Sequence, residues 1–206
     1  MFLSAINHDC KMSKDNKESC IHIYPDGGSY LGCIKDGKRH GNGSMTFSNY
    51  DTYEGCWSEG NMEGYGIYHF FDPDTDKFCG VYKGLFHKNL FEGYGELEIR
   101  KESYRGFWKE NMRNGEGISI FQDGSCFHGL WKDDHIVQGE LLLGNGDRYA
   151  GQFSNGIYNG NGKYFWKGGD WFVGLFKEGQ PIQGIKVKTS GEFVVIDSSN
   201  EESSNL

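Results

Sequence analysis

The chain has 206 residues and a formal net charge of −8, with a pI near 5.4, which disfavours nucleic-acid binding and weakens attraction to anionic membranes. It contains 32 glycines but only 3 prolines, which excludes collagen and proline-rich linkers and favours a fold with many tight turns. Aromatic residues make up 16% of the chain, and they favour β-strands.

The chain begins with a polar segment. Residues 1–20 show no periodicity, so we expect a disordered N-terminal tail. The opening MFLSAINHDC lacks the basic flank and apolar run of a signal peptide, and no segment reaches the ~20 apolar residues of a transmembrane helix. Ile21 to Gly28 has the pattern of the second half of a repeat and is predicted to act as an N-terminal cap.

One pattern then recurs seven times. Its clearest copy, YEGCWSEGNMEGYGIYHF, runs from Tyr53 to Phe70 and joins an aromatic-x-Gly-x-aromatic run, a polar turn and a Gly-x-Gly that opens a second apolar run. The copies begin at Tyr30, Tyr53, Tyr82, Tyr104, Phe127, Tyr149 and Phe172. Their spacing is 22 or 23 residues except for one step of 29, which an insertion near Asp72 to Cys79 explains. A fixed period indicates a repeat fold in which no unit buries its apolar face alone.

We number the first five positions of each copy as slots 1 to 5. Slots 1, 3 and 5 share one face of a strand because side chains alternate. Slot 1 is Tyr or Phe and slot 3 is always Gly, while slot 5 is Ile34, Trp57, Phe86, Trp108, Trp131, Phe153 or Phe176. We expect the glycine to make room for the flanking rings and for aromatic rings of adjoining repeats. The polar residues after slot 5 are predicted to form hairpin turns.

Two copies depart from this pattern in their second half. The fifth reads Gly139-Glu140-Leu141 and the seventh Gly184-Ile185-Lys186, each with one extra residue that we place in the turn, so we expect irregular curvature there. The seventh copy, followed by GEFVVI, is predicted to be the C-terminal cap. Residues 197–206 are expected to be a disordered acidic tail.

The motif YEGCWSEGNMEGYG resembles the MORN repeat, the membrane occupation and recognition nexus, over residues 21–196. With the hairpin pattern, the resemblance implies an all-β fold, an elongated, twisted single-layer antiparallel sheet of stacked β-hairpins. MORN arrays occur in cytoskeletal scaffolds, ciliary proteins and junctional membrane proteins, and as appendages of lipid kinases and lysine methyltransferases. The resemblance therefore implies a binding module and leaves the ligand open.

Slot 4 departs from the acidic or polar residue that is common in the family. Its residues are Cys33, Cys56, Leu85, Phe107, Leu130, Gln152 and Leu175, on the strand face opposite the rings. Two interpretations stay open. These side chains pack on long neighbours within the sheet, or they form a surface that a partner buries.

Catalytic and metal-binding patterns are absent from the sequence. Asp72 to Asp76 suggests a calcium loop, but Lys77 and Lys83 stand where that loop needs Gly and Glu. No histidine pairs with a nucleophile in a recognisable order, so we expect no enzyme, no cofactor and no metal. Cys33 and Cys56 would lie about 9–10 Å apart, beyond the ~7 Å limit for a disulfide, so the cysteines are expected to be free thiols in a reducing compartment.

The leading hypothesis is a non-catalytic scaffold, cytoplasmic and located at the cytoskeleton, a cilium or the inner face of a membrane. It would bind an extended or helical segment of a partner protein in a groove. The partner-binding candidates are Trp57, Phe86, Trp108, Trp131, Phe153 and Phe176 from slot 5 and Leu85, Phe107, Leu130 and Leu175 from slot 4.

Other functions remain open. A phosphoinositide-binding module would use the basic residues Arg100, Lys101, Arg105, Lys109 and Arg113, and a second basic cluster comprises Lys35, Lys38, Arg39 and His40. Both clusters are more typical of solvated loops than of a phosphate site. A regulatory subunit that holds an enzyme in trans is a third hypothesis. A homodimer is also predicted, because Gly191 to Ile196 offers an apolar edge strand to a second copy unless residues from Asp197 onward cover it.

Overall fold

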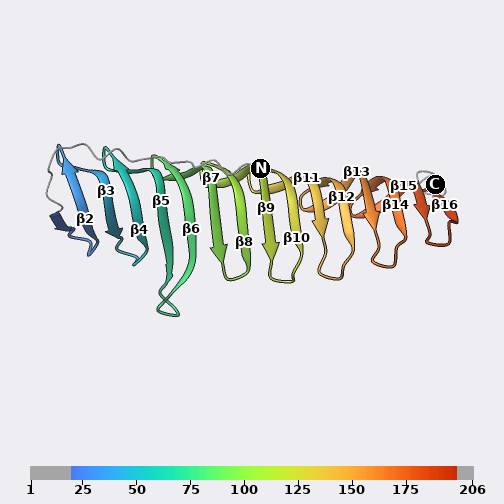
Figure 1. Ribbon diagram of the computed structural model, residues 1–206, viewed down its shortest axis with the longest axis horizontal. Coiled ribbons are helices and arrows are strands. Elements are labelled where there is room, and N and C mark those ends of the chain that lie inside the picture. Colours follow the sequence, from blue (N-terminus) through green and yellow to red (C-terminus); the bar gives the residue numbers. More distant parts are fainter. Residues whose placement is uncertain (1–19, 199–206) are drawn as a thin grey trace, which may run out of the picture. The chain divides into compact units, whose positions relative to one another are not determined.

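The computed structural model describes residues 20–198, and its regular structure there consists entirely of β-strands (Figure 1). Sixteen strands follow one another in chain order in one antiparallel sheet. This confirms the predicted all-β antiparallel sheet of stacked hairpins. The strands are β1 (Cys20–Ile23), β2 (Ser29–Lys35), β3 (Lys38–Thr46), β4 (Thr52–Ser58), β5 (Asn61–Asp72), β6 (Lys77–His87), β7 (Leu90–Ile99), β8 (Glu102–Lys109), β9 (Met112–Phe121), β10 (Cys126–Lys132), β11 (His135–Leu142), β12 (Arg148–Ser154), β13 (Ile157–Phe165), β14 (Trp171–Lys177), β15 (Gln180–Val187) and β16 (Phe193–Asp197).

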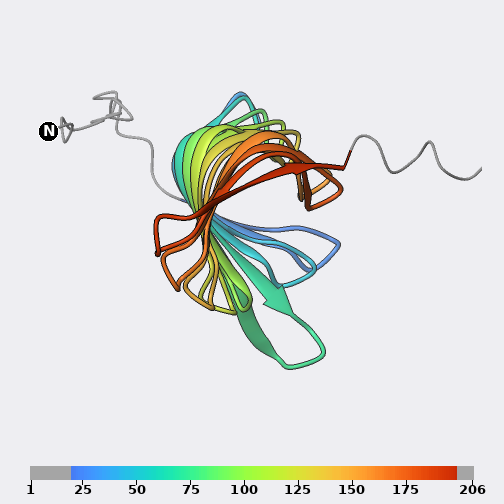
Figure 2. The ribbon, with the colours of Figure 1, turned by 90° about the vertical axis from the view of Figure 1, so that its right-hand side faces the viewer.

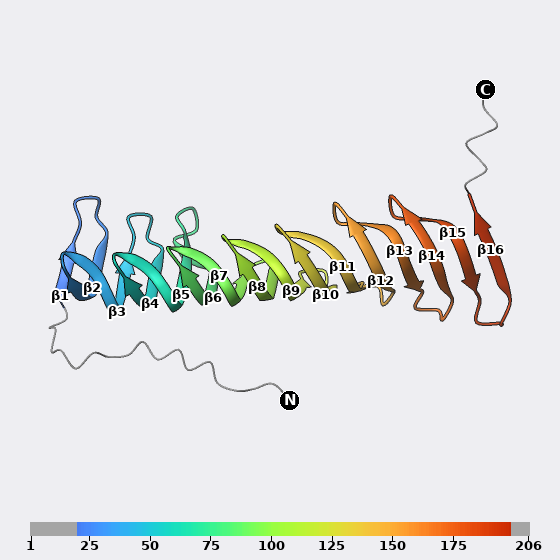
Figure 3. The same ribbon diagram turned by 90° about the horizontal axis from the view of Figure 1, so that it is seen from above.

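The chain falls into two compact units. The first unit contains the strands up to β7 together with residues 107–111, and the second contains residues 101–106 and the chain from Met112 onward, so that β8 is divided between them. Within each unit the successive hairpins lie side by side (Figure 3). We describe the two units separately below.

Two-residue turns close the hairpins. In the turn between β2 and β3, Asp36 and Gly37 have φ of 51° and 76°, and between β6 and β7, Lys88 and Asn89 have φ of 49° and 70°. Positive φ at both central residues is the type I′ geometry, whose twist matches that of antiparallel strands. The predicted hairpin turns are confirmed.

The second turn residue also bonds to the preceding hairpin. Asn89 donates its N–H to the carbonyl oxygen of Met62 at 3.1 Å and accepts the N–H of Met62 through its side-chain oxygen at 2.7 Å. Asn111 makes the same pair of bonds to Phe91, at 3.1 and 2.7 Å. Met62 and Phe91 are each the second residue of a hairpin's second strand. We call this the cover position and the bonds to it the turn latch.

The insertion near Asp72 lengthens the connection between two hairpins. β5 and β6 have 12 and 11 residues, and the turn that joins them extends past the connection between β3 and β4 (Figures 1 and 2). Asp72 accepts hydrogen bonds from the Thr75 hydroxyl at 2.9 Å and the Asp74 N–H at 3.1 Å, and it lies 3.5 Å from Arg100. Its carboxylate therefore holds the turn, and residues 20–198 contain no group of three acidic, His or Cys side chains that could hold a metal.

The slot 1 ring lies across the paired glycines of its own hairpin. Tyr53 is 1% exposed, and Gly55 pairs with Gly66 beneath it. A Cβ on Gly55 would lie 2.4 Å from the Tyr53 Oη, and one on Gly66 would lie 2.3 Å from its Cε2. The glycines are required, as predicted, but the ring they accommodate belongs to the same repeat and not to an adjoining one.

In the tyrosine repeats the ring's hydroxyl bridges a wide bulge. Between the pairs Gly55–Gly66 and Trp57–Met62, β4 has one residue and β5 has three. The first glycine of each Gly-x-Gly makes this bulge possible with a φ between 71° and 103°. The tyrosine then donates its hydroxyl to the carbonyl oxygen of slot 4, at 3.1 Å for Tyr30, 2.9 Å for Tyr53, 3.0 Å for Tyr82 and 2.8 Å for Tyr149.

The fifth and seventh repeats have a smaller bulge. Gly129 pairs with Gly139, and Gly174 pairs with Gly184, so each repeat keeps only the second glycine of the motif. The predicted extra turn residue was wrong. These hairpins are one residue shorter, because β11 places only two residues opposite Leu130. In both repeats the slot 4 residue is therefore still paired with a residue of the second strand. Slot 1 is phenylalanine, which has no hydroxyl that could bond across a bulge.

Exchanging the two ring types should destabilise the protein in both directions. Phe127 is 0% exposed, so Phe127→Tyr buries a hydroxyl beside a Leu130 that remains paired with Gln138, at a cost of about 1–3 kcal/mol. Tyr53→Phe removes the bond to Cys56 and should cost about 1 kcal/mol. Urea unfolding of both variants measures these costs. A Phe127→Tyr variant as stable as the parent would contradict this account of the bulge.

The predicted tails lie mostly outside the described residues. Of residues 1–20, only Cys20 is described, and it begins β1; of residues 197–206, Asp197 ends β16 and Ser198 bonds to Ile182. Cys10 also lies outside, and the described cysteines form no disulfide with one another. In β16, Phe193, Val194 and Val195 are 67%, 43% and 67% exposed, which is the edge where self-pairing was predicted.

Candidate functional site

The slot 5 rings predicted to anchor a partner are buried. Trp57, Phe86, Trp108, Trp131, Phe153 and Phe176 are 2–6% exposed. They pack edge-on against slot 1 rings, as Trp57 does against Tyr30 and Tyr53 with ring centroids 5.5 and 5.1 Å apart. Side chains with so little exposed area offer a partner almost no surface. In this structure they form the core and support the side chains above them.

Slot 4 lies on the opposite face of the sheet and keeps more exposed surface. Phe107 is 48% and Leu130 is 43% exposed, while Leu85 and Leu175 are half-buried. In the first unit Leu85 pairs with Tyr65, and the Phe107 ring lies 5.8 Å from that of Tyr94, so this face carries a short apolar row. In the second unit the neighbours are polar, with Leu130 opposite Glu116 and Gln138 and Leu175 opposite Asn161 and Gln183.

A further group of rings covers the face that carries slots 1, 3 and 5, which we call the ring face. In the first unit this aromatic cluster consists of Phe47, Tyr68, Phe70 and Phe91, all half-buried. Tyr68 lies 5.7, 5.0 and 6.5 Å from the other three rings in that order. None of these residues was a predicted site residue, although alternation after the Gly-x-Gly places Phe47, Tyr68 and Phe70 on the ring face. Phe91 precedes its Gly-x-Gly and lies there because it pairs with Phe86 of slot 5.

The aromatic cluster is held by hydrogen bonding and stacking. Tyr68 donates its hydroxyl to Asp51 at 2.7 Å, and Asp51 also accepts the Phe71 N–H at 2.7 Å. Burial, together with the bond to Asp51, raises the pKa of Tyr68, so its hydroxyl stays protonated at neutral pH. Phe91 stacks on Tyr82 with centroids 3.7 Å apart. The rings that remain half-exposed are therefore fixed in position.

The second unit has a smaller aromatic group on its ring face, formed by Tyr158, Tyr164 and Trp166. Tyr158 stacks on the buried Tyr149 at 4.0 Å, and Tyr164 lies 4.9 Å from Trp166. Tyr164 donates its hydroxyl to Asp147 at 2.8 Å, as Tyr68 does to Asp51 in the first unit.

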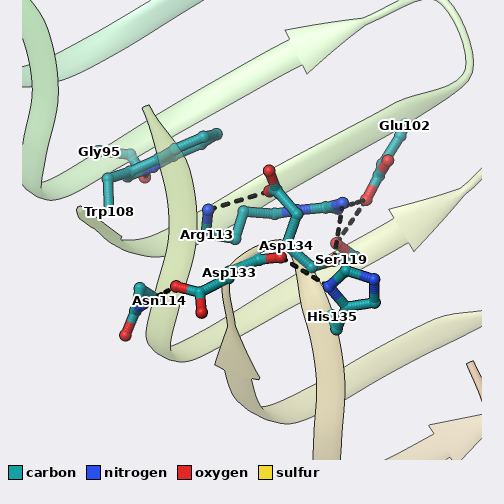
Figure 4. A network of polar contacts seen from close by, with 9 residues as sticks. All are labelled: Gly95, Glu102, Trp108, Arg113, Asn114, Ser119, Asp133, Asp134 and His135. Atoms are coloured by element: carbon teal, nitrogen blue, oxygen red, sulfur yellow. Dashed lines mark hydrogen bonds and ion pairs between the residues drawn. The ribbon is translucent and has the colours of Figure 1, made fainter. Parts of the chain in front are cut away.

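Among the basic residues proposed for lipid phosphate, Arg113 is fully engaged within the protein (Figure 4). Its Nη1 pairs with Glu102, its Nε donates to Asp134 at 3.0 Å, and its guanidinium carbon lies 4.1 Å from the Trp131 ring centroid. Ser119, which is 0% exposed, donates to Glu102 as well. An arginine whose charge is already paired with two carboxylates attracts a phosphate only weakly.

The other four basic candidates are divided between the two units. Arg100 pairs with Asp72 and donates to Thr75, while Lys101, Arg105 and Lys109 are exposed. Arg100 and Lys109 belong to the first unit, and Lys101, Arg105 and Arg113 belong to the second. Residues 20–198 also contain no helix able to span a membrane.

Arg39, from the other basic cluster, lies on the ring face of the first unit. Its guanidinium carbon is 4.3 Å from the Trp57 ring centroid and 5.9 Å from that of Tyr24. It donates to the carbonyl oxygen of Gly60 at 2.8 Å. Burial raises the pKa of the nearby Tyr30 to about 12, an effect that the Cys33 thiol reinforces and the positive charge of Arg39 opposes.

Comparison with known families gives the MORN repeat, matched over residues 30–52, 53–72, 82–100, 104–126 and 149–171, just over half of the chain. The chain belongs to the MORN repeat family. Every matched segment begins at a tyrosine, and the two unmatched hairpins are those that begin at Phe127 and Phe172. In four of the five matched segments the tyrosine hydroxyl bonds across the wide bulge, so the MORN pattern accompanies this arrangement. MORN repeats are a non-catalytic, binding type of repeat.

The curated proteins similar to this MORN chain include Alsin from three mammals. Identity over 72 residues is 35% for Alsin of Rattus norvegicus and 33% for those of Mus musculus and Homo sapiens. The alignment covers 32% of this chain and spans 4% of the length of these relatives.

Two solved structures show limited similarity. The G-box domain of the microcephaly protein CPAP has a TM-score of 0.47 and 13% identity, over 86% of this chain and 97% of that chain. The TCP domain of SAS-4 of Drosophila melanogaster, in complex with a proline-rich motif of Ana2, has a TM-score of 0.27 and 15% identity, over 86% and 89%. Since both scores are below 0.5, we argue the function from this chain's own residues.

Proposed function

We propose that this protein is a non-catalytic scaffold or adaptor that binds an extended or helical segment of a partner protein on the ring face of its first unit. The observation that carries the proposal is the aromatic cluster of Phe47, Tyr68, Phe70 and Phe91, half-exposed above a core of fully buried rings. Aromatic side chains supply much of the binding energy at protein interfaces, because they offer a large contact area with few rotatable bonds.

Rigidity of the aromatic cluster favours binding. The stack of Phe91 on Tyr82 and the bond from Tyr68 to Asp51 fix these rings before a partner arrives. A surface that is already ordered loses less conformational entropy on binding, so more of the contact energy contributes to affinity. The core tryptophans contribute indirectly, by holding the rings above them.

A polypeptide fits this surface better than an acidic lipid does. The net charge is −8, and Arg113 and Arg100 of the basic group are already paired with carboxylates. Following the family resemblance, we propose a cytoskeletal, ciliary or membrane-associated partner and a cytoplasmic location. Self-association through β16 is a separate prediction, tested by sedimentation of the full chain.

Two aromatic residues of β5 provide a matched test, because they lie on opposite faces of one strand. Phe70 belongs to the aromatic cluster, while Tyr65 lies on the slot 4 face and is 50% exposed. A random 16-residue peptide library displayed on phage is selected against the full chain, and the enriched peptides are synthesised. Phe70→Ser should weaken peptide binding about 10-fold or more, whereas Tyr65→Ser should change it less than about 2-fold, as measured by fluorescence anisotropy.

The outcomes separate the hypotheses. Loss of binding with Tyr65→Ser and not with Phe70→Ser would move the site to the slot 4 face and overturn the proposal as stated. Enrichment of no peptide, combined with flotation of the chain on vesicles only when they contain a phosphoinositide, would favour the lipid-binding alternative.

A further inference from the structure

Arg39 of the first unit and Arg113 of the second occupy equivalent places. Both are cover positions: Gly60 donates its N–H to the carbonyl oxygen of Arg39 at 3.0 Å, and Asp134 does the same to Arg113 at 3.0 Å. Both guanidinium groups lie on a slot 5 tryptophan, at 4.3 and 4.1 Å from the ring centroid. Their surroundings can therefore be compared position by position.

The two arginines differ in their carboxylate partners. Arg113 is paired with Glu102, two residues before its slot 1 ring, and with Asp134 in its turn latch. The matching positions in the first unit are Gly28 and Gly60. Both sources of negative charge are therefore missing around Arg39.

Nothing else in residues 20–198 supplies a carboxylate to Arg39. Its hydrogen bonds go to the carbonyl oxygen of Gly60 and to the sulfur of Met45 at 3.5 Å, and a thioether is a weak acceptor. Glu59 pairs with Lys38 at 2.9 Å and Asp26 accepts the Gly28 N–H at 3.0 Å, so both are engaged elsewhere. Asp36, three residues before Arg39, is exposed in the turn and forms no ion pair with it.

A guanidinium in this position is suited to capture a carboxylate. One of its faces rests on an apolar ring, the group is half-buried, and no carboxylate of residues 20–198 neutralises its positive charge. Arginine forms charge-assisted hydrogen bonds that are about twice as strong as neutral ones, often through two parallel N–H donors. The pairing of Arg113 with Glu102 and Asp134 shows the arrangement that Arg39 lacks.

We propose that Arg39 binds a carboxylate side chain of the partner segment, and this inference rests on the proposed function. The site adjoins the aromatic cluster: the Trp57 ring beneath Arg39 lies 5.1 Å from that of Tyr53, and Tyr53 pairs with Tyr68. The partner segment therefore carries an aspartate or glutamate beside the apolar residues that cover the rings.

Gly60→Asp tests this by supplying the missing carboxylate from within the chain. A Cβ at Gly60 would meet only the Lys38 Cβ, at 3.9 Å, and Asn89, Asn111 and Asp134 hold the same turn position with φ of 66–70°. The aspartate can then engage Arg39 as Asp134 engages Arg113. Gly60→Asn is the matched control, because it has the same shape without the charge.

The measurement uses the peptides selected against the full chain. They should be enriched in an acidic residue, and changing that residue to its amide should weaken binding to the parent about 10-fold or more. Gly60→Asp should weaken the acidic peptide about 10-fold, and Gly60→Asn should change its affinity less than about 2-fold. The amide peptide should bind all three proteins equally.

Peptides that bind without any acidic preference, or an acidic preference unchanged in Gly60→Asp, would overturn the inference and leave the proposed function standing. Failure to select any peptide would overturn both. If neutralising Asp15 and Glu18 together tightens peptide binding about 10-fold, this chain's own residues 1–19 are the occupant and the inference is wrong.

Discussion

Gly106→Val is expected to lower the free energy of unfolding by about 3 kcal/mol or more, as overpacking and disruption of a paired backbone do. A Cβ at this position would lie 2.4 Å from the Tyr104 Oη, 2.5 Å from the Gly117 Cα and 2.6 Å from the Glu116 carbonyl oxygen. Two of these atoms are backbone, so the strain cannot be relieved by a side-chain rotation and the strands themselves must move.

Gly168→Val is the matched control for this variant. A Cβ on Gly168 would meet nothing within 4 Å. Its effect on stability should stay within about 1 kcal/mol, as is usual for surface substitutions. Urea unfolding and thermal melting of both variants decide the matter. If the two valine variants melted at the same temperature, the ring would not be packed across the glycine pair as the structure has it.

Arg113→Met is expected to lower the free energy of unfolding by about 2–4 kcal/mol, because it leaves two carboxylates without their cation. The side chains of Arg113 and Glu102 are only 20% and 22% exposed, so water can replace the lost partner only in part. Methionine fits the position in principle, since Met62 occupies the same cover position in another hairpin. The loss should therefore come from charge and not from shape.

The double variant Arg113→Met, Glu102→Met separates these two causes. Removing both members of a buried ion pair is often close to neutral, but Glu102→Met also leaves the buried Ser119 hydroxyl without its acceptor, so the double variant should recover part of the stability lost by Arg113→Met alone. Urea unfolding of the four proteins of the cycle gives the coupling energy. If the loss of stability in the double variant equals the sum of the losses in the two single variants, Arg113 stabilises the protein by packing on Trp131 and not by pairing with Glu102.

The repeat fold could be predicted because its requirements are local. The period of 22 or 23 residues, the alternation of slots and the glycine at slot 3 are all visible in the sequence, and they determine strand, turn and core face. Which of the two glycines of the Gly-x-Gly motif Gly139 corresponds to could not be predicted in the same way. The motif contains two glycines, and only the pairing of Gly129 with Gly139 shows which of them this repeat retains.

The candidate site was harder to predict, because burial depends on strands that pair across the sheet. Alternation places Trp57 on the ring face, but the sequence does not show that Arg39 lies over it. Similarly, Arg113 was grouped with basic residues close to it in sequence. Its partners Glu102 and Asp134 stand 11 and 21 residues away, and only the fold brings the three together.

The turn latch also determines how such a chain can grow. In its two-bond form it uses an asparagine or aspartate in one hairpin and a backbone N–H at the cover position of the hairpin before it, which every residue except proline provides. Gly60 and Gly179 make only the backbone bond, to the carbonyl oxygens of Arg39 and Tyr158. A duplicated hairpin can therefore attach to almost any predecessor without further change. The last hairpin has Pro181 at its cover position, opposite Phe176. A hairpin placed after it could bond to the Pro181 carbonyl oxygen, as Gly60 bonds to that of Arg39, but a turn asparagine would find no N–H there. Proline at a cover position therefore favours glycine over asparagine in the next turn.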